Sequence, residues 1–323
     1  MTGLGDLSVF RGWYPWSKIQ GWLLKADIDL HLAVGRSLAN LAGFMSQDRN
    51  PQAEQMADES MIRNLAAQAN AIWPQERPLF ERYQLAADCR IADIGCGSGE
   101  ITSRLAGLYP RAEVVGIDIL EHTIALARGR HADLAPRVSF QQGDAFELKL
   151  PSAHYDLVVC RHVTQSIPEP ERVLAEMKRI CKPGGWLHVL SEDYHMLHFM
   201  PGELDADRFW SEYVPTASRG MGVDERVGRR TWTLLKHLGL EQLTVDFVTV
   251  DTLRVPRETF AAIIEAWRDG YTEVLSERTG RPRDEIRAYF EAMMASILNP
   301  DEYAVWQVPV LGGRKPAGGP SAG

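Results

Sequence analysis

The chain has 323 residues, of which 45% are hydrophobic and 24% charged, and its formal net charge at pH 7 is −8. This composition is typical of a globular protein with a sizeable core, and no apolar run is long enough to cross a membrane. The acidic balance and the lack of a Lys- or Arg-rich block argue against a nucleic-acid partner, which needs a basic surface. The four widely spaced cysteines favour buried reduced thiols over disulfides or metal ligands. With no secretion signal at the start, we expect a cytoplasmic enzyme without a resident metal.

Residues 1–83 are predicted to be mainly helical and to form a cap. Apolar side chains recur at four-residue spacing between Leu24 and Leu32, which is typical of an amphipathic helix. Aromatic residues near the start of the chain could stack on a flat substrate, or they could anchor the helices to the core. The candidates for substrate binding are Trp13, Tyr14 and Trp16.

From residue 89 onward, short apolar runs alternate with helical patterns. Strands that alternate with helices predict parallel βαβ units and therefore a doubly wound α/β sheet. The predicted strands lie at residues 89–97, 112–119, 138–145, 155–163 and 186–193, and the predicted helices between them lie at 100–110, 121–134 and 169–185.

After residue 193 the pattern is less regular, and the segment up to about residue 225 is left unassigned. A helix near residues 226–238, a strand at 243–253, a helical insertion at 257–298 and a last strand at 304–313 are predicted from there. We divide the chain into an N-terminal helical cap (1–83), a core (84–252), a helical insertion (253–303), the last core strand (304–315) and a disordered tail (316–323).

Three glycines follow the first core strand in the stretch "RIADIGCGSGE". Such a loop can cradle a ligand with backbone N–H groups and the N-terminus of a helix. The GxGxxG fingerprint of dinucleotide-binding proteins fits only in part, because Glu100 stands where its third glycine would be. Asp118 and Asp144 end the next two strands, where carboxylates could bind ribose hydroxyls and a base amine; either one alone could equally cap a turn.

In their order, "ADIGCGSG", "VVGIDI", "QGDAF", "YDLVVCRHV" and "CKPGGWLHVL" resemble the motif series of the class I S-adenosylmethionine-dependent methyltransferases, over about residues 75–195. The resemblance implies a Rossmann-like sheet of seven strands with the last one antiparallel, and S-adenosylmethionine (SAM) as the cofactor. It also implies a cofactor site in which Asp93, Gly95, Cys96 and Gly97 line the methionine part, Asp118 holds the ribose, Ile119 packs on the adenine, Asp144, Ala145 and Phe146 lie at the adenine amine, and the backbone of Cys160 and Arg161 lies near the amino group and the sulfonium.

The segment after the fifth core strand, "SEDYHMLHF", is dense in groups that can move a proton. Tyr194, His195 and His198 are the candidate general bases, although any single histidine could be an ordinary loop residue. No "NPPY"-like stretch follows the fourth strand, where "CRHVTQ" stands instead, and within the family this disfavours methyl transfer to adenine or glutamine.

We therefore predict methyl transfer to a small aromatic or heteroaromatic metabolite, of the indole or phenol type met in specialised metabolism. The predicted mechanism is in-line displacement with a base after strand five. Two other functions stay open: a nucleotide-cofactor-dependent oxidoreductase, and a binding protein with a vestigial cofactor pocket. The sequence leaves the identity of the acceptor and the oligomeric state undecided.

Overall fold

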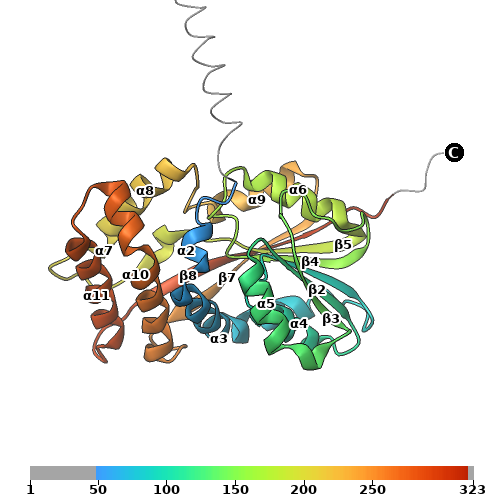
Figure 1. The fold of residues 1–323 in the computed structure, drawn as a ribbon, viewed down its shortest axis with the longest axis horizontal. Coiled ribbons are helices and arrows are strands. Elements are labelled where there is room, and N and C mark those ends of the chain that lie inside the picture. Colours follow the sequence, from blue (N-terminus) through green and yellow to red (C-terminus); the bar gives the residue numbers. More distant parts are fainter. Residues whose placement is uncertain (1–48, 319–323) are drawn as a thin grey trace, which may run out of the picture. The chain divides into compact units, whose positions relative to one another are not determined.

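One mixed sheet of eight strands runs through the part of the chain that the computed structural model describes, residues 49–318 (Figure 1). Residues 1–48 and 319–323 lie outside that range. They include Trp13, Tyr14 and Trp16 and more than half of the predicted cap. The strands are β1 (Arg90–Ile94), β2 (Glu113–Asp118), β3 (Val138–Gln142), β4 (Tyr155–Arg161), β5 (Cys181–Leu190), β6 (Leu197–His198), β7 (Glu241–Asp251) and β8 (Val305–Arg314).

Five strands pair in parallel in the order β3-β2-β1-β4-β5, and β8 continues the sheet antiparallel to β5. β7 pairs antiparallel with the other edge of β8. The predicted fold class, a Rossmann-like doubly wound sheet with an antiparallel last strand, is confirmed. The sheet has eight strands where seven were predicted. β5 pairs only with residues 310–314 of β8, so the same edge of β8 is open near its start, where the two-residue strand β6 pairs with Val305 and Trp306.

Helices cover both faces of the sheet. α3, α4 and α5 lie on one face, and α6 and α9 lie on the other (Figure 1). The helices are α2 (Ala53–Ala57), α3 (Glu59–Glu81), α4 (Glu100–Leu108), α5 (Glu121–Arg130), α6 (Pro170–Ile180), α7 (Ala206–Arg208), α8 (Val214–Met221), α9 (Gly228–His237), α10 (Arg257–Thr279) and α11 (Arg283–Leu298).

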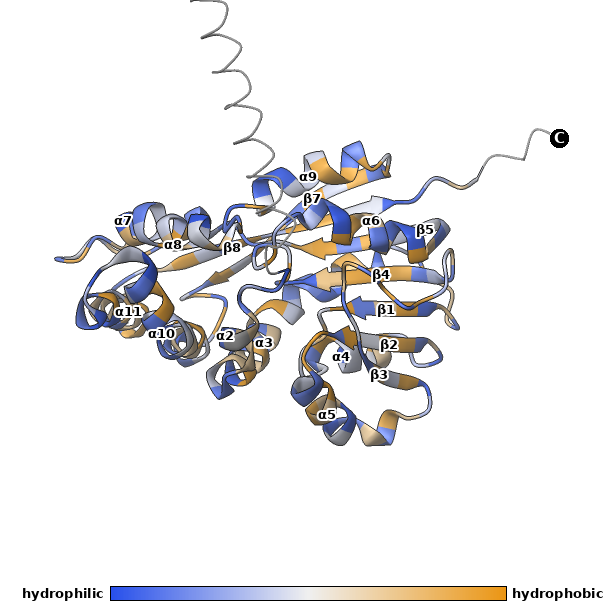
Figure 2. Ribbon diagram, turned by 45° about the horizontal axis from the view of Figure 1, so that its top comes forward, coloured by the Kyte–Doolittle hydropathy of each residue, from blue (hydrophilic) through white to orange (hydrophobic). Residues whose placement is uncertain are grey.

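The two faces of the sheet have separate cores because successive side chains of a strand point to opposite sides. In β1, Ile91 belongs to the cluster that contains side chains of α3, α4 and α5, whereas Ala92 belongs to the one that contains side chains of α6 and α9. Figure 2 shows the hydrophobic residues gathered on the strands and on the helix sides that meet them. The parallel strands are covered on both faces, as parallel sheets require.

A third apolar cluster joins the far half of β7 and β8 to the helices inserted around them. Trp306 and Val308 of β8 pack against Phe260 and Ile264 of α10 and against Phe290 of α11. α7 and α8, which follow β6, belong to the same end of the molecule (Figure 1). The predicted helical insertion is therefore a helix pair that buries the start of the last strand.

The segment "CKPGG" differs from its prediction. The helix was expected to run to the glycines, but α6 ends at Ile180 and β5 begins at Cys181, which already pairs with Tyr155 of β4. Gly185 has no room for a side chain, since a Cβ there would lie 2.9 Å from the carbonyl O of Asp156. The glycine therefore serves close strand packing and does not end the helix.

Candidate active site

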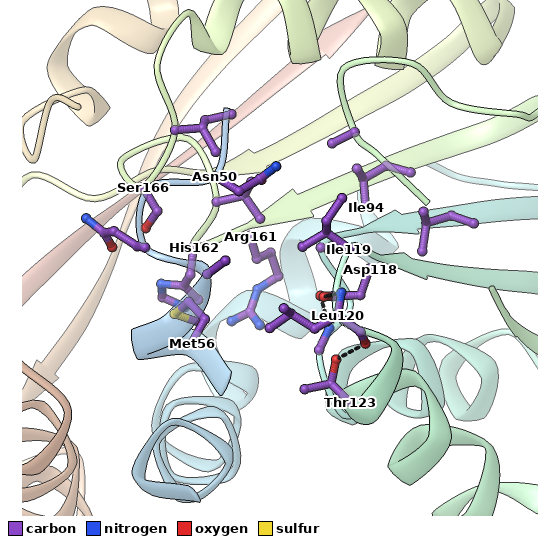
Figure 3. A pocket seen from close by; sticks show the side chains of 18 of the residues that line it. Asn50, Met56, Ile94, Asp118, Ile119, Leu120, Thr123, Arg161, His162 and Ser166 are labelled. Carbon is purple, nitrogen blue, oxygen red and sulfur yellow. Dashed lines mark hydrogen bonds between the residues drawn. The ribbon is translucent and has the colours of Figure 1, made fainter. Parts of the chain in front are cut away.

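A cavity with about 830 Å³ of empty volume opens at the C-terminal ends of β1, β2 and β4 (Figure 3). We call it the first cavity. Asp118 and Thr123 lie at one end of it, Met56 and His162 lie at the other, and Arg161 lies between them. Its position is the one where open α/β sheets bind ligands.

The glycine loop in this cavity is held by its own hydrogen bonds. The N–H groups of Gly95 and Cys96 donate to the carbonyl O of Ile117 at 2.7 and 3.0 Å, and the N–H of Gly97 donates to Asp118 Oδ2 at 2.8 Å. A dinucleotide pyrophosphate would need such N–H groups to be free. The loop therefore fits a ligand without phosphates better than the cofactor of an oxidoreductase.

Asp118 ends β2 and presents its carboxylate to the first cavity. Its Oδ1 accepts a hydrogen bond from the N–H of Leu120 at 3.0 Å, so with the Gly97 bond each oxygen keeps a lone pair for a ligand. Burial raises the pKa of Asp118 above 3.8, although the two backbone donors act in the opposite direction. The carboxylate is placed to accept from two ribose hydroxyls, and Ile119 beside it also lines the cavity.

The three residues predicted to lie at the adenine amine occupy different places. Ala145 lines the first cavity. Asp144 Oδ1 accepts from the N–H of Phe146 at 2.8 Å and so caps the turn after β3. Phe146 is buried in the core under the guanidinium of Arg172, which lies 5.3 Å from its ring centre. Of the three, only Ala145 is a wall of the cavity.

A smaller cavity of about 350 Å³ adjoins the first one and shares the walls Leu65, Gly95, Arg161 and His162 with it. We call it the methionine-end cavity. Asp93 and Cys96 line it, and the Cys160 side chain is buried in the sheet. That Asp93, Cys96 and the backbone of Cys160 surround the methionine part stays a prediction. Burial raises the pKa of Asp93 to about 6, while a 2.6 Å hydrogen bond from Thr102 opposes the rise.

Arg161 is the buried cation of this site. Its Nε donates to Glu76 Oε1 at 2.8 Å, and His188 Nε2 lies 3.0 Å from the same oxygen. Burial alone would raise the pKa of Glu76, but the charge of Arg161 and the His188 hydrogen bond outweigh burial and lower it. Arg161 Nη2 is buried without a hydrogen-bond partner among residues 49–318, so it is available to a ligand carboxylate.

The residues present thus fit SAM. Its ribose, its adenosine body and its methionine carboxylate each have a complementary group, in Asp118, in the apolar walls of the first cavity and in Arg161. The role of the Arg161 side chain and its partner Glu76 could not be predicted from the sequence, because the two residues are 85 positions apart.

A second cavity, with about 570 Å³ of empty volume, shares the wall residue Gln52 with the first. Its walls are aromatic: Tyr194 stacks on Trp210 with ring centres 5.2 Å apart and meets Trp267 edge-on at 5.4 Å. The hydroxyl of Tyr271, another wall, donates to Gln52 Oε1 at 3.1 Å. Trp210, Trp267 and Tyr271 come from segments in which the sequence suggested no site, whereas Tyr194 belongs to the segment of the candidate bases.

The three candidate bases after β5 do not converge. Tyr194 lines the second cavity, and burial raises its pKa well above 10, so that its hydroxyl stays protonated. His195 does not line either cavity, and its Nε2 is buried without a partner in the described part of the chain. His198 is exposed, with Nδ1 3.2 Å from Asp207 Oδ1. Sequence reasoning did not single out His162, whose place directly after β4 was the available signal.

Several other features bear on the predicted class. Within residues 49–318, no helix is long and apolar enough to span a bilayer, and no group of three or more His, Cys, Asp or Glu side chains could hold a metal ion. All four cysteines are buried free thiols, as predicted. Burial raises the pKa of Cys96 well above 9, so this wall of the methionine-end cavity is a neutral thiol.

The parallel sheet with its antiparallel last strand, the internally bonded glycine loop and the acid at the end of β2 define a Rossmann-like domain that binds a nucleoside without phosphates. Residues 85–215 match the family described as "Methyltransferase domain". Residues 85–215 are therefore a methyltransferase domain, and the motif series within them is that of the class I SAM-dependent enzymes, whose cofactor is SAM.

Individual relatives agree on the domain. The chain is 36% identical over 115 residues to trans-aconitate 2-methyltransferase of Methylobacterium nodulans, a match that covers 36% of this chain and 43% of the relative. It is 30% identical over 160 residues to the ubiquinone/menaquinone biosynthesis C-methyltransferase UbiE of Ectopseudomonas mendocina, covering 46% and 62% of the two chains. The chain thus spans less than two thirds of the length of either relative.

One solved structure extends the likeness of the fold. It contains a Haloferax volcanii methyltransferase in complex with the Trm112 methyltransferase activator, and it matches with a TM-score of 0.52 at 15% identity. The match covers 84% of this chain and 100% of that one. At this identity the likeness concerns the fold alone.

Proposed function

We propose that this protein transfers a methyl group from SAM to a small aromatic or heteroaromatic acceptor. The observation that carries the proposal is that two cavities share the wall residue Gln52, since one of them fits SAM and the other is walled by Tyr194, Trp210 and Trp267. Aromatic walls favour a flat ligand, which can stack on them or meet their edges.

The chemistry asks little of the protein beyond alignment. Bound SAM supplies a methyl group on a positively charged sulfur, and an acceptor lone pair forms a bond to that carbon while the C–S electron pair leaves with sulfur. Asp118 and Arg161 would hold the donor from its two ends, and the second cavity would hold the acceptor away from water.

Polar groups in the second cavity narrow the acceptor further. Glu225 Oε1, Gln165 Oε1 and Trp210 Nε1 are buried and have no hydrogen-bond partner in residues 49–318. Glu225 Oε1 lies 3.4 Å from the Nε of exposed Arg226, but without hydrogen-bond geometry. Because two of the three atoms are acceptors, a ring that carries an N–H or O–H donor would satisfy them, as an indole, phenol or aryl amine does.

The test is a transfer assay with methyl-labelled SAM and a panel of phenols, aryl amines and indoles, with aliphatic carboxylic acids as the comparison set. We expect label in at least one aromatic member, together with S-adenosylhomocysteine. Label only in aliphatic acids would overturn the acceptor class. S-adenosylhomocysteine binding without transfer to any member of a broad metabolite screen would instead favour a binding protein with a vestigial pocket.

A further inference from the structure

His162 stands at the junction of the two ends of the cofactor site. The first cavity holds the Asp118 side of the site, and the methionine-end cavity holds the Arg161 Nη2 side. Their shared walls are Leu65, Gly95, Arg161 and His162. In SAM the sulfonium joins the nucleoside to the methionine, so the shared walls surround the position that the reactive sulfur would take. His162 is the one shared wall that can take up a proton at neutral pH.

The imidazole of His162 is held by one buried carboxylate. Its Nδ1 is hydrogen-bonded to Glu192 Oε1, and the Glu192 side chain is completely buried directly after β5. In the pairing of a neutral imidazole with an ionised carboxylate, which only accepts hydrogen bonds, Nδ1 carries the proton and Nε2 keeps a lone pair. That Nε2 is buried and finds no hydrogen-bond partner anywhere in the described residues.

The backbone at both residues is tightly constrained. His162 has φ +55°, in the left-handed region that side chains other than glycine rarely adopt, and its N–H donates to the carbonyl O of Leu190 at 3.1 Å. The carbonyl O of Glu192 accepts from the N–H of Gly228 at 2.7 Å, where a Cβ would lie 2.8 Å from the same oxygen. Strained backbone that persists in this way is concentrated at functional sites.

We propose that His162 is the general base of the methyl transfer and that Glu192 is its positioning residue. As the acceptor lone pair bonds to the methyl carbon, His162 Nε2 takes the proton from the acceptor O–H or N–H, and the thioether leaves with the C–S electron pair. Glu192 fixes the tautomer and stabilises the imidazolium that forms. This inference rests on the proposed function, and it places the base after β4 instead of after β5.

The tautomer can be measured without any acceptor. In protein labelled with ¹⁵N-histidine and saturated with S-adenosylhomocysteine, the signals of His162 are those that disappear in His162→Gln. We expect Nδ1 protonated and Nε2 bare at pH 8. A predominant Nε2–H tautomer would overturn the proposal, since that nitrogen could not accept a proton.

The same spectra test Glu192. In Glu192→Gln the amide can accept from Nδ1–H or donate to a bare Nδ1, so a share of the Nε2–H tautomer should appear. An unchanged tautomer in a folded Glu192→Gln protein would overturn the positioning role.

Turnover supplies the second readout. On the aromatic probe that wild type methylates best, His162→Gln should lower kcat by on the order of 10²–10⁴-fold, with the Kd of S-adenosylhomocysteine changed less than about threefold. Glu192→Gln should lower kcat less and leave the acceptor KM nearly unchanged. The matched control is His154→Gln, which should behave as wild type. His154 directly precedes the N-terminal end of β4, whereas His162 follows the C-terminal end.

Two results separate the possible failures. Wild-type kcat in His162→Gln, with transfer intact, would overturn the base and leave the proposed function standing. If wild type transfers no methyl group to any probe, the proposed function fails, and a bare Nε2 in the spectra would then support His162 as a base poised for another acceptor.

Discussion

The first and second cavities lie next to each other but are built in different ways. Most walls of the first come from one stretch, residues 94–167, and much of its shape is made by backbone at strand ends. The walls of the second come from four separated parts of the chain: Gln52, Gln165, residues 194–225 and residues 267–290. The proposed donor site is therefore encoded by short motifs, whereas the proposed acceptor site depends on how distant helices pack. Changes to one cavity should leave binding in the other intact.

The largest expected effect is a loss of stability when the carboxylate that pairs with the buried Arg161 is removed. Glu76→Gln leaves Arg161 without its carboxylate partner, a change that costs about 3–5 kcal/mol of unfolding free energy when the pair is buried. Chemical denaturation should show this loss at pH 7.

The pH dependence of the unfolding free energy tests the Glu76–Arg161 pair in a second way. The pKa of Glu76 is lowered in the folded protein, from 4.5 to about 2, because Arg161 and His188 outweigh its burial. A depressed carboxyl pKa contributes stability that is present above 4.5 and is lost as the pH falls toward the folded value. The difference in unfolding free energy between wild type and Glu76→Gln should therefore become smaller from pH 5 to pH 2. A difference that grows over this range would mean that the pair does not lower the pKa of Glu76.

Gly95→Ala should be the next largest change and should act on the donor alone. A Cβ at this position would lie 2.2 Å from Val163 Cγ2, and the residue has φ +75°. Left-handed strain and overpacking each cost about 1–3 kcal/mol, so S-adenosylhomocysteine should bind roughly 30-fold more weakly or worse. Gly107→Ala is the control, because its Cβ would meet open space within α4. Calorimetric affinity equal to wild type in Gly95→Ala would refute the tight loop.

Asp118→Ala should weaken S-adenosylhomocysteine roughly tenfold or more, because a hydrogen bond to a charged group is worth about 1.5–3 kcal/mol. Asp144→Ala is the comparison at the end of the neighbouring strand. Its carboxylate caps a turn, so we expect a stability loss of about 1 kcal/mol and little change in affinity. Equal losses of affinity in both variants would mean that Asp144 also contacts the cofactor.

The smallest effect is expected on acceptor binding, from a substitution in the second cavity. Glu225→Gln keeps the shape of the side chain but exchanges a charged acceptor for a neutral one, which is worth about 1 kcal/mol. The acceptor KM should rise roughly fivefold while the Kd of S-adenosylhomocysteine stays unchanged. Glu291→Gln, exposed on α11, is the control. A change confined to cofactor affinity would show that Glu225 belongs to the donor site.

The sequence pointed to the edge of the sheet where the first cavity lies because its signals there are local. The glycine loop and Asp118 lie within 24 residues of each other, from 95 to 118, and the alternation of strands and helices orders the sheet around them. The acceptor side was missed for the opposite reason. Trp210 and Trp267 are 57 positions apart but lie 5.8 Å apart between ring centres, and no periodicity in a single element predicts such a contact.

The predicted bases illustrate the same limit. Tyr194 does line the acceptor cavity, but His162 and Glu192 meet only because β4 and β5 are neighbours in the sheet. Their pairing would have required the register of two strands, which the sequence did not supply. The substrate roles of Trp13, Tyr14 and Trp16 stay predictions.

The shape and hydrogen bonds of the first cavity suit SAM and not a dinucleotide. Calorimetric titration of the wild-type protein with S-adenosylhomocysteine and, separately, with NAD and NADH tests it most directly. We predict one site with a micromolar Kd for S-adenosylhomocysteine, weakened roughly tenfold or more in Asp118→Ala, and no heat with either dinucleotide. Micromolar binding of NAD or NADH without binding of S-adenosylhomocysteine would show that the first cavity is a dinucleotide site.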